Sequence, residues 1–185
     1  MEFLEPRAFL NHIAPLIRAA GAEHEVRFDL TAGRVVKFTL HPMEVVNDSE
    51  IELYLERLAL TNEVFGDDYR VAGWVEFPGE QGVRLVVTQP WYRTRNGEAV
   101  HPTDLQIWSY MTTLGFQRVG EGMYHHPELQ LAVSDAVGKN FVLDLAGAVK
   151  PVDLQVMRPD ATMQAALERL AQAQPAVQVA TGAEN

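Results

Sequence analysis

The sequence contains no cysteine, and this one absence excludes several kinds of site. Disulfide bonds, thiolate zinc centres and cysteine nucleophiles all require a sulfhydryl group. Long apolar runs are also missing, since no stretch approaches the roughly 20 apolar residues of a membrane-spanning helix. The N-terminal segment 1–6 is acidic and lacks the apolar core of a signal peptide. We therefore expect a cytoplasmic protein with no membrane partner.

Lysine and arginine are scarce relative to aspartate and glutamate, 15 against 25, and the formal net charge is −10. Binding to nucleic acid relies on clustered positive charge that neutralises phosphates, so we expect no nucleic-acid partner. The same deficit argues against binding to an anionic membrane surface. With 185 residues, of which 47% are hydrophobic, the chain is long enough for one domain or one small bilobed unit.

Four segments carry apolar residues at helical spacing, and shorter segments have the patterns of strands. The predicted helices span residues 7–20, 50–65, 104–114 and 161–173. The predicted strands span residues 25–30, 34–40, 69–77, 83–88, 129–133, 140–145 and 149–154. Capping boxes at Ser49/Glu52 and Thr103/Gln106 mark the starts of the second and third helices. We expect Pro15 to interrupt the first helix, because proline breaks a helix interior.

The order of these segments is helix, hairpin, helix, two strands, helix, short strands and helix. Such an order is typical of an α+β fold with an antiparallel sheet rather than of a repeated βαβ series. Residues 174–185 are expected to form a disordered tail.

Three polar residues in the C-terminal third, Asp135, Asn140 and Asp153, have a spacing that suits phosphoryl transfer. In kinases a loop aspartate orients the attacking hydroxyl, an asparagine binds a metal ion, and a further aspartate chelates Mg²⁺. The two predicted strands between Asn140 and Asp153 turn at Gly147 and return the chain to the same edge. Ordinary turn residues beside a hairpin are the competing interpretation, because aspartate and asparagine are common in turns.

The spacing of these three residues is similar to that in the kinase-like superfamily. The wider sequence resembles the kinase domain found in polyvalent proteins of phages and conjugative elements. The resemblance covers roughly residues 20–158 and is carried by the stretches 33–37, 54–58, 62–68, 87–91 and 133–140. It implies a minimal protein-kinase-like fold with an antiparallel N-terminal sheet, one helix packed on it and a reduced C-terminal lobe. Residues 1–91 are then expected to form the first part and residues 92–173 the second.

The resemblance also implies roles for residues outside the loop. Lys37 is expected to contact the phosphates of ATP and to pair with a glutamate of the second helix. That partner is expected to be Glu56, with Glu52 and Glu63 as alternatives. Lys37 as a solvent-facing strand residue and Glu56 on a solvated helix face are the competing interpretations.

The nucleotide is expected to lie between a hinge and a phosphate-covering loop. By resemblance, Thr88, Gln89 and Trp91 belong to the hinge segment 88–91, which contacts adenine through backbone groups. Residues 21–26 occupy the position of the phosphate-covering loop. The expected cofactors are therefore ATP and Mg²⁺, with Asp135 as the catalytic residue and Asn140 and Asp153 as the metal ligands.

Several positions depart from the pattern of typical kinases. The loop 21–26 has one glycine where typical kinases have several. Val137 stands where protein kinases usually carry a basic residue, and Lys139 is expected to substitute for it. Asp153 is followed by Leu154-Gln155 instead of Phe-Gly, and only one predicted helix follows.

These departures leave alternative functions open beside an ATP-dependent kinase of unknown acceptor. One is a catalytically degenerate kinase-like module that binds nucleotide or only a protein partner. Another is a structural component of a mobile-element system. The pair His125-His126 has no second group of ligands at useful spacing, so we interpret it as a surface turn rather than as a metal site.

Overall fold

The computed structural model describes residues 2–20, 23–44, 48–93 and 98–173, and all structural statements concern these residues. The predicted tail 174–185 and the first two residues of the predicted loop 21–26 lie outside them. The fold is mixed α/β, and its strand ladders are all antiparallel, as the sequence predicted. No helix within the described ranges is long and apolar enough to cross a membrane.

Four helices, one short 3₁₀ turn and eleven strands make up the described fold. The helices are α1 (Pro6–Ile13), α2 (Asp48–Phe65), α3 (Asp104–Thr113) and α4 (Ala161–Ala173), with η1 (Gly138–Asn140) as the 3₁₀ turn. The strands are β1 (Ile17–Ala20), β2 (His24–Asp29), β3 (Arg34–Thr39), β4 (Arg70–Val75), β5 (Arg84–Pro90), β6 (Gln117–Gly120), β7 (Met123–His126), β8 (Leu131–Ser134), β9 (Phe141–Leu143), β10 (Val149–Pro151) and β11 (Gln155–Met157).

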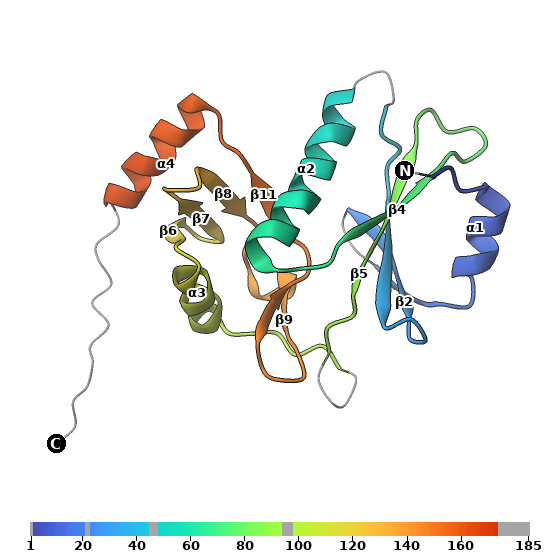
Figure 1. Ribbon diagram of the computed structural model, residues 1–185, viewed down its shortest axis with the longest axis horizontal. Helices are drawn as coiled ribbons and strands as arrows, with labels where there is room; N and C mark the ends of the chain where they lie inside the picture. The colour runs from blue at the N-terminus through green and yellow to red at the C-terminus, as the bar shows by residue number, and fades with distance from the viewer. Residues whose placement is uncertain (1, 21–22, 45–47, 94–97, 174–185) are drawn as a thin grey trace.

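The N-terminal sheet has five strands in the order β1-β2-β3-β5-β4 (Figure 1). Phe9 and Ile13 of α1 pack against one face of this sheet. Tyr54 and Leu58 of α2 pack against the other face. The prediction of a single covering helix was therefore incomplete, because the amphipathic α1 buries an apolar stripe of its own.

The predicted helix over residues 7–20 was wrong in its second half. Helix α1 ends at Ile13, with the Ala14 N–H bonded to the Leu10 carbonyl at 2.9 Å. Ala14 keeps helical backbone angles, but Pro15 lacks an N–H and cannot donate the next helical hydrogen bond, so the helix stops there. The chain then forms β1, which pairs with β2 along its full length.

The C-terminal half contains a four-stranded sheet, β11-β8-β7-β6, and the separate hairpin β9–β10. Its core includes Ile107, Met111 and Phe141, all at most 1% exposed. The interpretation of His125-His126 as a surface turn was wrong. Both residues lie in β7 and are buried, at 1% and 8% exposure. His125 Nε2 lies 3.2 Å from Gln164 Oε1 of α4, and the Phe116 ring packs edge-to-face against His126.

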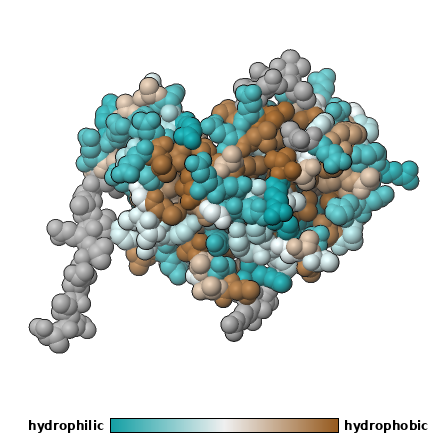
Figure 2. Space-filling view, viewed as in Figure 1, coloured by the Kyte–Doolittle hydropathy of each residue, from teal (hydrophilic) through white to brown (hydrophobic). Residues whose placement is uncertain are grey.

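Helix α2 belongs to both halves of the molecule. Its Leu58 packs toward the N-terminal sheet, whereas Leu60 and Phe65 enter the C-terminal core. In Figure 1 this helix stands between the two groups of strands, with α1 and α4 at opposite ends. Figure 2 shows several separate brown apolar patches on this face, with teal polar surface between them.

Candidate active site

A cleft of about 530 Å³ lies between the N-terminal sheet and the C-terminal half. The polar residues that line it include most of the predicted site residues and come from distant segments: Glu23, Lys37, Gln89, His101, Asp135, Lys139, Asn140, Asp153 and Gln155. The cleft also has apolar lining from both sides, including Ala19, Val26, Phe28, Val35, Trp91 and Val142. Because apolar walls with a few convergent polar groups are typical of ligand sites, this cleft is the candidate active site.

Asp135 and Asn140 hold each other in a tight loop. Asp135 has φ = 56°, a left-handed conformation that aspartate adopts more readily than most residues. The Asn140 side-chain amide donates to the Asp135 carbonyl at 2.8 Å and to Asp135 Oδ2 at 2.6 Å. Asn140 is buried at 6% exposure, whereas the Asp135 side chain is 47% exposed. The Asn140 amide thus holds Oδ2 of Asp135 in place, while the Asp135 carboxylate stays accessible from the cleft.

The segment that carries Asp153 is tied to the same loop and to the sheet. The Val152 N–H donates to the Asn140 carbonyl at 2.9 Å. The Val152 carbonyl accepts hydrogen bonds from Lys37 Nζ and, at 2.7 Å, from the Tyr69 hydroxyl. The two short strands of the β9–β10 hairpin therefore bring the chain back to the loop, and Asp153 lines the same cleft as Asp135 and Asn140.

Lys37 is a buried cation whose direct partners are uncharged. It projects from β3 at 7% exposure and donates to the Tyr69 hydroxyl at 3.1 Å as well as to Val152. Burial lowers the pKa of Lys37, and the nearby charges of Asp153 and Asp67 oppose that effect. Within the described ranges no carboxylate oxygen lies within ion-pair distance of Nζ. A desolvated ammonium with neutral partners is suited to receive an anionic ligand.

The predicted pair between Lys37 and Glu56 is not formed. Glu56 lies on an exposed face of α2, and its Oε1 is 3.5 Å from Nε of Arg158. The two alternatives for this pairing, Glu52 and Glu63, have no ion pair with Lys37 either in the part of the chain that the structure describes. The next residue of the helix, Arg57, instead reaches two residues that line the cleft, Glu23 and Gln155.

Arg57 forms an ion pair with Glu23, which lines this side of the cleft. The Arg57 guanidinium donates to both Glu23 oxygens, at 3.2 and 2.9 Å, and also to Gln155 Oε1. Gln155 Nε2 donates to Glu23 Oε2 at 3.3 Å. Burial raises the pKa of Glu23, but the hydrogen bonds and charge of Arg57 outweigh it and leave this pKa below its usual value. The carboxylate is therefore held ionised and in one orientation.

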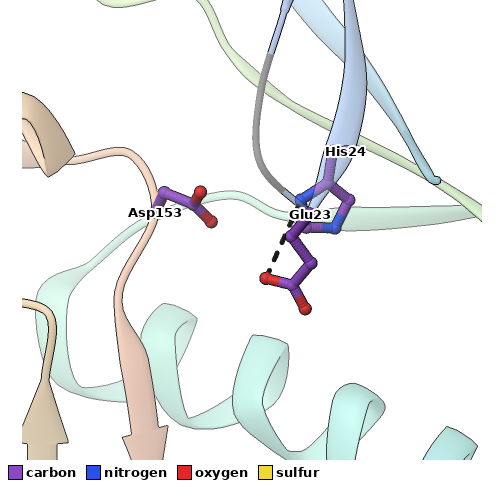
Figure 3. A group of neighbouring side chains, drawn as sticks. All are labelled: Glu23, His24 and Asp153. Carbon is purple, nitrogen blue, oxygen red and sulfur yellow. Dashed lines mark ion pairs between the residues drawn. The ribbon is translucent and has the colours of Figure 1, made fainter. Parts of the chain in front are cut away.

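Glu23, His24 and Asp153 come together across the cleft (Figure 3). One ligand atom from each lies within 4.8 Å of the others. His24 is 4% exposed, and its Nε2 lies 2.8 Å from the Tyr54 hydroxyl. Burial, and then the charge of Lys37, lowers the pKa of His24 to about 4, so the imidazole is neutral at pH 7. Burial in turn raises the pKa of Tyr54.

The first residues of the predicted hinge segment 88–91 lie in a strand. Strand β5 continues to Pro90, so Thr88 and Gln89 are strand residues. Side chains alternate between the faces of a strand, which places Gln89 in the cleft and Thr88 on the face toward α1, where its Oγ1 accepts from Arg34. Trp91 lines the cleft, but its N–H donates to the Gly33 carbonyl at 3.0 Å.

Two residues of the turn after α2 support the cleft, and the sequence did not identify them. Asp67 accepts from Gln89 Nε2 and from the Tyr92 hydroxyl, both at 2.7 Å. Burial raises the pKa of Tyr69 well above its usual value, so its hydroxyl stays protonated between Lys37 and Val152. Both residues lie in the stretch 62–68 or directly after it, where a polar turn following Gly66 was the available signal.

Comparison with known proteins places the chain in a kinase family. At a coarse level the chain is a kinase-like phosphotransferase, a class that in general uses a nucleotide and a metal ion. The chain belongs to the family described as "Serine/Threonine/Tyrosine Kinase found in polyvalent proteins", whose profile matches residues 7–157. The family resemblance in the sequence is thereby confirmed. Neither the curated proteins nor the solved structures provided a match.

Proposed function

We propose that the chain is an ATP- and Mg²⁺-dependent kinase whose reaction takes place in the cleft between the two halves. One observation carries this proposal: Lys37, Asp135, Asn140 and Asp153, from three distant segments, line a single cleft. Residues 1–91 act as the N-lobe-like part and residues 92–173 as the reduced C-lobe-like part. The acceptor is a hydroxyl-bearing group, because the loop aspartate is suited to orienting and deprotonating a hydroxyl.

The lining of the cleft fits both cofactors. Val26, Val35 and Val142 offer apolar surface to a flat heterocycle, and Trp91 adds an aromatic ring to the same lining. The buried ammonium of Lys37 has no carboxylate partner in the described ranges and can receive phosphate oxygens. Asn140 and Asp153 supply the amide and carboxylate oxygens that Mg²⁺ prefers. When bound, the metal would neutralise charge on the phosphates.

In this proposal some residues of the chain bind the phosphates, and others orient the acceptor hydroxyl and accept its proton. Lys37 fixes the phosphates and stabilises the negative charge that they carry. Asp135 accepts a hydrogen bond from the acceptor hydroxyl and takes its proton as the hydroxyl oxygen bonds to the γ-phosphorus of ATP. The bond from that phosphorus to the oxygen bridging to the β-phosphate breaks, and ADP leaves. Asn140 keeps Asp135 in place through its amide hydrogens, at 2.8 and 2.6 Å. Lys139 Nζ, 3.9 Å from Asp135 Oδ2, adds positive charge at the mouth of the cleft.

A phosphate-transfer assay tests the proposal. The full chain is incubated with γ-labelled ATP and Mg²⁺, and label is followed in the protein, in added peptides and small hydroxyl compounds, and in released phosphate. The proposal predicts transfer or slow hydrolysis that requires both ATP and Mg²⁺. ATP binding without any transfer to acceptor or water would contradict it.

Two observations favour a nucleotide- or protein-binding module as the second candidate. The backbone donor of Trp91 is engaged by Gly33, and Pro90 has no N–H, which removes two hinge donors for adenine. After Asp153 the described chain passes directly into β11 and α4. In this alternative the cleft binds its ligand without reaction, and the transfer assay separates it from the first candidate.

A further inference from the structure

The cluster formed by Glu23, His24 and Asp153 has the composition of a transition-metal site. We propose that it binds a divalent transition-metal ion directly, in the absence of nucleotide. Figure 3 shows the three side chains converging from two sides, Glu23 and His24 at the start of β2 and Asp153 between β10 and β11. This site goes beyond the proposed catalysis, although it shares Asp153 with it.

The distances within the cluster are close to those of a metal site. A carboxylate oxygen from each acid and a ring nitrogen of the histidine all lie within 4.8 Å of one another. Two ligands at about 2.1 Å from one ion lie at most about 4.2 Å apart. A small inward movement of the three side chains is therefore sufficient to complete three bonds to a single cation.

His24 is oriented as a ligand. Its ring is buried at 4% exposure, and Nε2 is engaged by the Tyr54 hydroxyl at 2.8 Å. When Nε2 carries the proton and donates to Tyr54, Nδ1 has a free lone pair directed at Glu23 Oε2, 4.0 Å away. No other contact with Nδ1 occurs among the residues that the structure describes. A hydrogen bond that fixes one ring nitrogen and frees the other is characteristic of metal-binding histidines.

The two carboxylates are presented in different ways. Glu23 Oε2 accepts hydrogen bonds from both Arg57 and Gln155, whereas Oε1 accepts only from Arg57 and keeps a further lone pair for a cation. Asp153 is partly buried, and no hydrogen bond within the described ranges occupies its carboxylate. In the described ranges, hydrogen bonds therefore hold the Glu23 carboxylate in place, whereas the Asp153 carboxylate has none and is available to a metal ion.

The ligand set determines the class of metal. One imidazole nitrogen with two carboxylates suits Mn²⁺, Fe²⁺ or Zn²⁺, whereas Mg²⁺ prefers oxygen ligands alone. Lys37 and Arg57 lie beside the same carboxylates and oppose the entry of a cation. We therefore expect an exchangeable ion rather than a permanently bound one.

Titration of the nucleotide-free full chain with Mn²⁺, followed by electron paramagnetic resonance, tests the proposal. The wild type should bind Mn²⁺, and Mg²⁺ should displace it only at large excess. Glu23→Gln and His24→Gln should each weaken Mn²⁺ binding about tenfold or more. The matched controls Glu128→Gln and His12→Gln replace exposed residues outside the cluster and should bind as the wild type does.

One further variant separates this site from the proposed nucleotide site. Asn140→Ala should weaken binding of Mg²⁺·ATP but leave Mn²⁺ binding to the nucleotide-free chain unchanged. Thermal melting without metal establishes that each variant is folded. If only one of Glu23→Gln and His24→Gln folds, that variant alone is enough for the test. Wild-type Mn²⁺ affinity in a folded Glu23→Gln or His24→Gln variant would overturn the proposal, as would loss of Mn²⁺ binding in Asn140→Ala. A chain that bound Mn²⁺ but never ATP would contradict only the proposed kinase function.

Discussion

The two sides of the cleft differ in how closely they follow the expected pattern of a kinase. On the loop side, Asp135 and Asn140 are bonded to each other across five residues of sequence. On the sheet and helix side, Lys37 faces neutral oxygens, and the expected Glu56 turns away toward Arg158. The spacing of nearby residues in the sequence therefore predicted contacts better than the expected pairing of residues from distant elements did.

The difference has a physical origin in the position of α2. This helix packs on the sheet through Leu58 and into the C-terminal core through Leu60, and this double packing fixes its rotation. The rotation directs Arg57 toward Glu23, which lines the cleft, and leaves Glu56 on the surface. The helix therefore contributes a positive charge, that of Arg57, where the negative charge of Glu56 was expected. Glu23, which precedes β2, balances this positive charge.

The largest effect is expected on the loop side. Asp135→Asn keeps the shape of the side chain but removes the group that accepts the proton. We expect the rate of phosphate transfer to fall about a hundredfold or more, with little change in the affinity for ATP. Rates from the γ-labelled ATP assay and affinities from calorimetry check this. Transfer at the wild-type rate would remove Asp135 from the mechanism.

The second prediction compares neighbouring residues of α2. Arg57→Ala leaves the partly buried Glu23 carboxylate without its main partner and should lower the free energy of unfolding by about 1–2 kcal/mol. Glu56→Gln removes only an exposed ion pair and should change it by less than about 0.5 kcal/mol. Urea denaturation of both variants measures the two values. Equal losses would mean that the rotation of α2 differs from that described.

The third prediction concerns the link between the two sides. Tyr69→Phe removes the hydroxyl that donates to the Val152 carbonyl at 2.7 Å and accepts from Lys37 at 3.1 Å. We expect a loss of stability of about 1 kcal/mol, because the two bonds are replaced by none. Thermal melting should detect this loss, with Tyr124→Phe, a buried tyrosine of the C-terminal core, as the matched control. A smaller loss for Tyr69→Phe than for its control would show that the hydroxyl does not connect the sides.

The smallest effect is expected at the exposed ion pairs of Asp68. Hydrogen bonds from Arg70 and Arg34 lower the pKa of Asp68 to about 2, below its usual value of 3.8. A lowered pKa stabilises the fold above pH 3.8, and this contribution is lost as the pH falls toward 2. Asp68→Asn should therefore flatten the acid limb of the stability curve slightly, and added salt should reduce the difference. An identical acid limb in both proteins would show that the pairs contribute nothing.

Much of the fold could be predicted from the sequence. The capping box Thr103/Gln106 defined the start of α3, and Gly147 at φ = 79° marked the turn of the β9–β10 hairpin. These signals are local, so they do not depend on the rest of the fold. Strands β6, β7 and β11 were missed because each is only three or four residues long, too short to show a clear alternation of apolar and polar residues.

The candidate site could be predicted in part. Asp135, Asn140 and Asp153 were identifiable because a hairpin of fixed length brings them to one edge. Thr88 was assigned to the hinge because nothing in the sequence shows that β5 runs two residues further, to Pro90. The association of Glu23 with Arg57 depends on the rotation of α2, which only tertiary packing sets.

The most direct test of the account is whether residues from both sides of the cleft bind one nucleotide. Calorimetry with Mg²⁺ and a non-hydrolysable ATP analogue compares the wild type with Lys37→Met, Asp153→Asn and Thr88→Val. Lys37 and Asp153 line the cleft, whereas Thr88 lies on the opposite face of the sheet. We predict that the first two variants bind about tenfold more weakly or worse, and that Thr88→Val binds as the wild type does. Equal affinity in all four proteins, or no binding to any of them, would contradict the account.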